Sequence, residues 1–158
     1  MKLLIVDDQA TNRRLLRAQL EAEGHATLEA ADGVAALELL KHTPVDTVIS
    51  DLLMPRMDGF ALCHAIRQHE QLRNLPLVVL TSTYNSRADE QMAYRMGADK
   101  YLVKPAPPEV LARTLDELRS DARYRQPRAP QPQPEAVVLQ EYNSTLVRKL
   151  EEKNLDLE

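Results

Sequence analysis

Short aliphatic runs separated by amphipathic segments recur five times along the first 120 residues. Four of these runs show no polar alternation, which is typical of strands that are buried on both faces of a sheet. The four runs are Leu3–Val6, Thr47–Ile49, Leu77–Leu80 and Tyr101–Val103. A fifth run, Ala26–Ala30, alternates Thr27 and Glu29 with apolar residues and predicts a strand nearer the edge of the sheet.

Helical patterns, with apolar side chains three, four or seven residues apart, lie between and after these runs. The predicted helices are Thr11–Glu23, Gly33–His42, Phe60–Gln68, Ser86–Met96 and Pro107–Ser120. Gly97 follows the fourth helix at a position suited to a left-handed helix cap. Strand and helix therefore alternate five times, which predicts right-handed crossovers and a parallel sheet covered on both faces. Any ligand site is expected at the carboxyl ends of the strands.

The chain has a different character after residue 122. Residues 126–134 contain four prolines and predict an extended, semi-rigid spacer. We therefore predict a folded domain at 1–122, a Pro/Gln-rich linker at 123–134 and an amphipathic helix at 135–158, leading to an output domain that the sequence does not contain.

The predicted C-terminal helix carries a heptad pattern. One heptad position holds Ala136, Asn143, Leu150 and Leu157, and the position three residues later holds Leu139, Leu146 and Lys153. This spacing is typical of a short coiled coil, in which Asn143 would favour a defined dimer register. A single amphipathic helix that docks on the folded domain explains the same pattern. Both interpretations remain open on the sequence alone.

The composition narrows the function classes. The formal net charge of −4 disfavours a nucleic-acid binder, because affinity for the phosphate backbone depends on clustered Lys and Arg. The single cysteine, Cys63, cannot form an internal disulfide and falls in a helical pattern, which favours a buried thiol in a reducing compartment. The first apolar run is too short for a signal peptide or a membrane span. We expect a cytoplasmic protein without nucleic-acid or membrane partners.

Candidate chemistry gathers where the predicted strands end. Asp7 and Asp8 follow the first strand, Asp51 follows the central one, and Thr81 and Lys104 end the fourth and fifth. Three neighbouring carboxylates repel one another, which predicts a divalent cation such as Mg²⁺, although single acids after strands are also common helix caps. With a hydroxyl and a lysine, these acids predict a site where a carboxylate attacks a phosphoryl group.

The order and spacing of several short motifs resemble the response regulator receiver family of two-component signalling over residues 1 to about 120. The motifs are Asp7-Asp8, Asn12-Arg13, Asp51-Leu52-Leu53-Met54-Pro55, Met57-Asp58-Gly59, Thr81-Ser82, Gly97-Ala98 and Tyr101-Leu102-Val103-Lys104-Pro105. The resemblance implies an α/β fold, a flavodoxin-like (β/α)5 three-layer sandwich around a five-stranded parallel sheet of order 2-1-3-4-5.

The resemblance also implies roles for the residues of the site. Asp51 would accept a phosphoryl group from the phosphohistidine of a histidine kinase or phosphotransfer protein. Mg²⁺ would be bound by Asp8, by Asp51 and by the backbone carbonyl of Leu53, with Asp7 acting through water. The chain would then be a signalling phosphoacceptor rather than an enzyme.

The resemblance implies a switch as well. Lys104 would pair with Asp51 or its phosphoryl group, and the peptide bond to Pro105 would be cis. Thr81 would move to the phosphoryl group and Tyr101 would rotate into the space it leaves, which changes the surface around the fifth strand. Tyr101 is alternatively an amphipathic residue with an exposed hydroxyl. The output would be a downstream domain or a homodimer formed through the C-terminal helix or the surface of the fourth and fifth strands.

Two other functions are compatible with parts of this pattern. A receiver-like module that binds partners without phosphorylation would be favoured by the loss of Asp8, Asp51 or Lys104, and all three are present. A hydrolase that forms an aspartyl-phosphate intermediate places its nucleophile and acid two residues apart after the first strand. The sequence Asp7-Asp8-Gln9 lacks that spacing.

Overall fold

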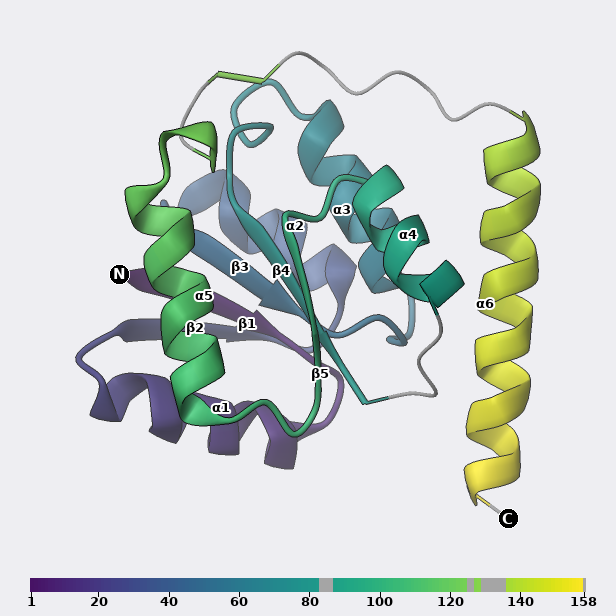
Figure 1. Cartoon of the computed structure of the whole chain (residues 1–158), viewed down its shortest axis with the longest axis horizontal. Helices are drawn as coiled ribbons and strands as arrows, with labels where there is room; N and C mark the ends of the chain where they lie inside the picture. The colour runs from purple at the N-terminus through teal and green to yellow at the C-terminus, as the bar shows by residue number, and fades with distance from the viewer. Residues whose placement is uncertain (83–86, 125–126, 129–135, 158) are drawn as a thin grey trace.

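A computed structural model describes residues 1–82, 87–124, 127–128 and 136–157. Its centre is a parallel sheet of order β2-β1-β3-β4-β5 (Figure 1). The strands are β1 (Lys2–Val6), β2 (Ala26–Ala30), β3 (Thr47–Ser50), β4 (Leu77–Thr81) and β5 (Lys100–Val103). The predicted strand order is confirmed.

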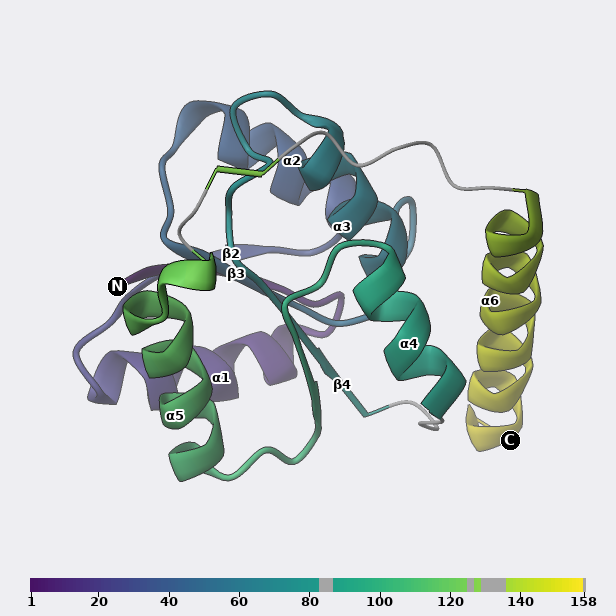
Figure 2. The ribbon, with the colours of Figure 1, turned by 45° about the horizontal axis from the view of Figure 1, so that its top comes forward.

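Helices cover both faces of the sheet, as the alternation of elements predicts (Figures 1 and 2). One face carries α1 (Ala10–Ala22) and α5 (Pro108–Ser120). The other carries α2 (Gly33–His42), α3 (Gly59–Gln68) and α4 (Arg87–Arg95). A short 3-10 helix (Ala122–Tyr124) follows α5, and the C-terminal helix α6 spans Ala136–Leu157. The predicted α/β three-layer fold and the C-terminal helix are both confirmed. Ser86, predicted to open α4, lies outside the described residues.

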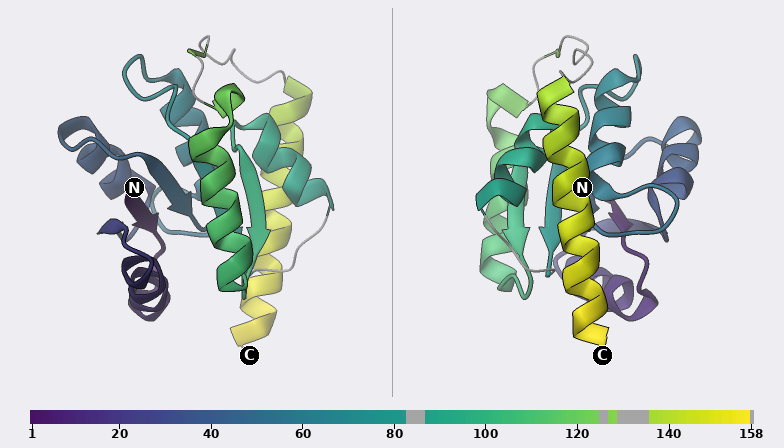
Figure 3. Two further views of the ribbon diagram at one scale, coloured as in Figure 1. Left: turned by 60° about the vertical axis from the view of Figure 1, so that its left-hand side comes forward. Right: turned by 90° about the vertical axis from the view of Figure 1, so that its right-hand side faces the viewer.

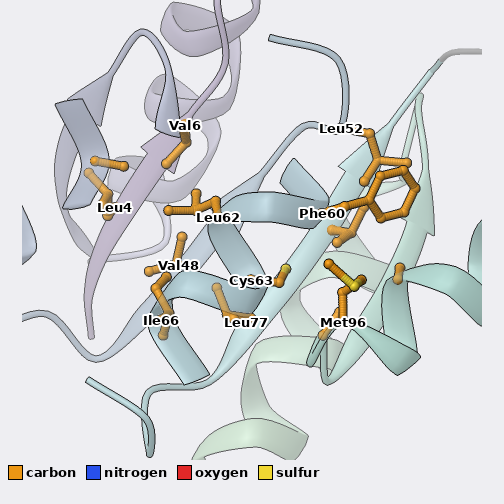
Figure 4. Close-up of a cluster of buried hydrophobic side chains, with 14 of the residues drawn as sticks. Leu4, Val6, Val48, Leu52, Phe60, Leu62, Cys63, Ile66, Leu77 and Met96 are labelled. Atoms are coloured by element: carbon orange, nitrogen blue, oxygen red, sulfur yellow. The ribbon is translucent and has the colours of Figure 1, made fainter. Parts of the chain in front are cut away.

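Two hydrophobic cores form because successive strand residues point to opposite faces of the sheet. Leu3 and Ile5 of β1 face α1 and α5, whereas Leu4 and Val6 face α2, α3 and α4. Figure 4 shows the larger core, where Phe60 at the start of α3 is fully buried. This explains why the runs in the sequence are uniformly aliphatic rather than alternating.

The predicted burial of β5 is wrong in part. Its residues are half-buried and Val103 is 47% exposed, whereas every residue of β3 and β4 is buried. β5 lies at the edge of the sheet and pairs with one strand only among the described residues, β4, which leaves it less covered than β3 and β4. The other edge strand, β2, has the partial exposure that its polar alternation predicts.

The end of α4 shows the predicted glycine cap. Gly97 has a φ of 116°, a left-handed value that favours glycine. A Cβ at this position would lie 2.5 Å from Cγ of Arg67. Arg67 crosses from α3 and donates from Nε to the Gly97 carbonyl at 2.9 Å. The cap is therefore fixed by sterics as well as by backbone conformation.

The C-terminal helix α6 lies alongside α4, as two views agree (Figures 1 and 3). Arg128, from the predicted linker, forms an ion pair of 2.9 Å with Asp99. Linker residues 125–126 and 129–135 lie outside the described part of the chain, and the domain boundaries at 122 and 134 stay predictions. No helix within the described residues has both the length and the apolar character needed to cross a membrane.

Candidate functional site

Three aspartates meet at the carboxyl edge of the sheet. Asp7 and Asp8 follow β1 and Asp51 follows β3, the two strands that pair at the centre of the sheet. One carboxylate oxygen of each lies within 4.8 Å of the others. Asp7 and Asp51 are buried, and Asp8 is partly exposed. The loop geometry thus concentrates negative charge at one point, as the strand ends predict.

Lys104, directly after β5, faces two of these carboxylates. Its Nζ donates to Asp7 Oδ2 at 2.7 Å and to Asp51 Oδ2 at 3.3 Å. Burial alone would lower the pKa of Lys104, but the charges of Asp51 and Asp7 outweigh it, so the pKa lies above its ordinary value. The lysine is therefore charged at neutral pH. Its peptide bond to Pro105 is cis.

Backbone contacts fix both buried carboxylates. Leu52 N donates to Asp51 Oδ1 at 2.7 Å, and Gln9 N donates to Asp7 Oδ1 at 2.9 Å. Arg13 reaches back from α1 and donates to the Asp7 carbonyl at 2.7 Å. The N-cap residue of α1 is Gln9, so neither Asp7 nor Asp8 is that helix's cap. The alternative prediction that these acids cap the following helix is therefore wrong.

The loop between β3 and α3 is packed tightly under Asp51. A Cβ at Gly59 would lie 2.2 Å from the Asp51 carbonyl oxygen, so only glycine fits. Asp58 caps α3 by accepting a hydrogen bond from Ala61 N at 2.9 Å. Arg56, with a φ of 65°, pairs with Asp32 at 2.7 Å and joins the loop to the start of α2. These contacts fix the loop both to Asp51 and to the start of α2.

Thr81 and Tyr101 lie on the last two strands of the chain, β4 and β5. Thr81 is fully buried at the end of β4, and its carbonyl accepts a hydrogen bond from Lys104 N at 2.9 Å. Tyr101 pairs with Val79 across β4 and β5 and is half-buried against the larger core. The structure therefore brings together Asp7, Asp8, Asp51 and Lys104, and the backbone of Lys104 joins this group to Thr81. Tyr101 of β5 lies three residues before Lys104. Leu53 is buried in the adjoining loop.

Comparison with known proteins now identifies the family. The profile described as "Response regulator receiver domain" matches residues 3–116. The chain belongs to the response regulator receiver family. It is therefore a receiver domain of the kind found in two-component systems, and in this family such domains are signalling phosphoacceptors that interact with histidine kinases or phosphotransfer proteins.

Individual relatives agree with this assignment. A chemotaxis protein CheY homolog from Campylobacter jejuni is 38% identical over 120 residues, which is 75% of this chain and 92% of that protein. The probable transcriptional regulator ycf27 of Porphyridium aerugineum is 36% identical over 119 residues, 75% of this chain. The match spans about half of that regulator's length, 48%.

A solved structure shares the fold. The signal receiver domain of a signal transduction histidine kinase from Syntrophus aciditrophicus superposes with a TM-score of 0.71 at 33% identity. The superposition covers 81% of this chain and 96% of that one.

Two acids of this receiver were not among the candidate site residues. Asp58 accepts a hydrogen bond from Tyr142 of α6, and Asp89 of α4 pairs with Arg148 and Lys149 of the same helix. Asp58 belongs to the family motif, which does not indicate a partner on α6. Nothing in the local sequence around Asp89 indicates a partner 60 residues away, so the sequence carries no signal for that contact.

Proposed function

We propose that this receiver stores a signal as an aspartyl phosphate on Asp51. The supporting observation is the Lys104 ammonium, which lies between the buried carboxylates of Asp7 and Asp51. A carboxylate oxygen of Asp51 forms a P–O bond while the P–N bond of a phosphohistidine breaks, and that electron pair stays on the imidazole nitrogen of the donor. The receiver contributes position and charge neutralisation rather than further covalent chemistry.

The donor set at the sheet edge fits Mg²⁺, which takes oxygen ligands and keeps several waters. Asp8, Asp51 and the backbone carbonyl of Leu53 would hold the ion, with Asp7 acting through water. The ion would neutralise phosphoryl oxygens and offset the repulsion among three carboxylates that lie within 4.8 Å of one another. Chelation of Mg²⁺ by EDTA is therefore expected to abolish phosphorylation.

The switch that follows uses two neighbouring strands. The Thr81 hydroxyl, at the end of β4, would donate a hydrogen bond to a phosphoryl oxygen, and Tyr101 of β5 would turn toward the space that Thr81 leaves. Tyr101 is half-buried two residues before Val103, which pairs with Thr81, so a change of its rotamer would alter the surface over β5 and α4. The phosphorylation state thereby becomes a difference in surface shape.

The donor protein is expected to approach over a groove between α1 and the loop after β5. Asp7, Leu15, Lys104 and Pro105 line this groove, and Leu15 is 68% exposed. Leu15, Leu16 and Ala106 together give this groove an apolar lining beside the charged site, and contiguous apolar surface of this kind marks protein-binding sites. The substitution Leu15→Glu should slow transfer from the kinase but not from acetyl phosphate. Val34→Glu, on α2 and 40% exposed, is the matched control.

The output side includes pairing with a second copy of the chain. Leu139, Asn143, Leu146 and Leu150 form a stripe along α6, here called the outer face. Leu139 and Leu150 are 46% and 48% exposed, and Asn143 would face its own copy across a parallel pair. Light scattering should show a dimer that Leu150→Glu separates. A dimer unaffected by Leu150→Glu would point instead to the surface of β4 and β5.

The central experiment measures phosphoryl uptake directly. Incubation with acetyl phosphate and Mg²⁺, followed by intact-mass analysis, should show one added phosphoryl group. Asp51→Asn should abolish the addition, whereas Asp116→Asn, which alters an exposed acid on α5, should not. No addition to the natural chain would favour the alternative function, a receiver that binds partners without phosphorylation.

A further inference from the structure

One side of α6 packs onto α3 and α4 (Figures 1 and 3). The Tyr142 hydroxyl donates to Asp58 Oδ2 at 2.5 Å, and its ring meets Phe60 edge-on with 5.8 Å between centroids. Thr145 is buried one turn later, and Lys149 is fully buried after another turn. These three residues, Tyr142, Thr145 and Lys149, are called the inner face of α6.

A buried ion pair lies at the centre of this contact. Lys149 Nζ donates to Asp89 Oδ2 at 3.0 Å, and both side chains are 0% exposed. Arg148 donates to the other carboxylate oxygen. The attraction within a buried pair only roughly offsets the hydration that both groups lose. Detachment of α6 returns both charges to water. The pair therefore determines where α6 binds but adds little net free energy to its docking.

The first anchor, Asp58, is rigidly connected to Asp51. Asp58 ends the loop that follows Asp51 and caps α3. The next residue, Gly59, donates from N to the Leu52 carbonyl at 2.7 Å and has no room for a Cβ against Asp51. A displacement of the backbone at Asp51 therefore moves the start of α3 and with it the partner of Tyr142.

The second anchor, Asp89, lies in the first turn of α4. That helix follows β4, which ends at Thr81. Burial raises the pKa of Tyr101, and the charges of Asp89 and Glu90 on α4 and, more weakly, that of Asp51 raise it further. Tyr101 lies on β5, which contacts α4. The two anchors continue from the two strands, β3 and β4, whose ends carry Asp51 and Thr81.

The inner and outer faces of α6 point in different directions. Successive helix residues turn by about 100°, which places the mean direction of the outer face roughly 100° from that of the inner face. The exposure of Leu139 and Leu150 agrees with this separation. A second copy can therefore pair with the outer face while the inner face remains docked.

We propose that the inner face of α6 binds α3 and α4 reversibly, and that phosphorylation of Asp51 releases it while the outer faces of two copies stay paired. This reversible contact is called the latch. This inference rests on the proposed phosphorylation of Asp51. The helix bridges two elements, so it stays bound only while the spacing between Asp58 and Asp89 is kept. Separating a buried charge from its partner is costly, so a small shift of either element favours release.

Hydrogen exchange of the full chain tests the latch. Mass spectrometry would compare the amides of α6 with and without beryllofluoride and Mg²⁺, while fluorine NMR reports whether beryllofluoride is bound. We expect protection of α6 to fall roughly tenfold, the response to a shift of about 1.4 kcal/mol in docking. Protection of β1 and β3, and the mass from light scattering, should not change.

The possible outcomes separate the two proposals. Bound beryllofluoride with unchanged or increased protection of α6 would overturn the latch and leave the phosphorylation of Asp51 standing. The absence of a bound fluorine signal would overturn the proposed function, and with it the dependence of the latch on phosphorylation. A fall in protection together with dissociation of the dimer would show that the two faces of α6 are not independent.

A variant and its control test the docked contact before any phosphoryl analogue is added. Lys149→Met removes the cation that faces Asp89 and should lower protection of α6 in the absence of beryllofluoride, while binding of beryllofluoride persists. Glu141→Gln breaks an ion pair with Arg95 in the same contact, where the two side chains are 48% and 49% exposed. This control should leave protection unchanged, because exposed pairs contribute little.

Discussion

The substitution Asp89→Asn removes the negative charge that faces Lys149 and Arg148 and nearly preserves the size of the side chain. Removing one partner of a buried ion pair ordinarily costs about 3–5 kcal/mol. The cost is limited here, because Lys149 lies on α6 and regains water when that helix detaches. The loss of stability cannot exceed the free energy that holds α6 on the receiver.

That free energy has few contributions. The ring pair of Phe60 and Tyr142 contributes about 0.5–1.5 kcal/mol. The hydrogen bond from Tyr142 to the Asp58 carboxylate contributes about 1.5–3 kcal/mol, and ordering of the side chains opposes both. We therefore expect α6 of Asp89→Asn to be detached for most of the time. The free energy of unfolding of the receiver core should fall by less than about 1 kcal/mol.

Urea unfolding followed by circular dichroism measures the core, and hydrogen exchange measures α6 in the same variant. Phe60→Ala supplies the contrast, since loss of a buried aromatic ring should lower the stability of the core by about 3–5 kcal/mol. A loss of about 3 kcal/mol or more in Asp89→Asn, with α6 still protected, would refute the reasoning. It would show that α6 is a permanent part of the core.

Three further predictions concern the site and its surroundings. Leu53 is apolar and cannot orient an attacking water, so Leu53→Asn should shorten the lifetime of the aspartyl phosphate in Mg²⁺; an unaltered decay rate removes Leu53 as the cause. Burial raises the pKa of Cys63 to about 12, above its ordinary 9.0, so stability should fall as pH rises from 9 toward 12. At pH 8, iodoacetamide should label this thiol only when the protein unfolds. Rapid labelling of the folded protein would contradict the burial of Cys63. Gly59→Ala should displace Asp51 and slow uptake from acetyl phosphate, whereas Gly24→Ala, with a φ of 92° but open space around it, should lower only the melting temperature.

The fold follows from the sequence because its causes are local. Each aliphatic run is followed by a helical period, and parallel strands are the arrangement that this alternation allows. The error at β5 shows where this reasoning ends. Tyr101–Val103 is as apolar as the buried runs, yet its side chains are more exposed because β5 lies at the edge of the sheet. The residues of the run do not indicate that position.

The candidate site could be located for a related reason. Strand ends in a parallel sheet meet at one edge, so the sequence alone predicts that Asp7, Asp51 and Lys104 lie together. The anchors of α6 could not be located in this way. Asp89 and Lys149 are separated by 60 residues, and the heptad spacing directs attention to Leu139 and Leu150 on the outer face. Only the packed structure shows which side of the helix faces the receiver.

The two-anchor contact of α6 has a consequence for whatever binds that helix. When one binding event changes the affinity for a second, the second changes the affinity for the first by the same factor. If phosphorylation at Asp51 weakens the hold of α3 and α4 on α6, then a partner that captures the inner face must favour the phosphorylated form by the same factor. Such a partner would increase the affinity of Asp51 for beryllofluoride from a distance, without touching the acidic site. A downstream partner of this receiver would then also regulate how readily Asp51 is phosphorylated.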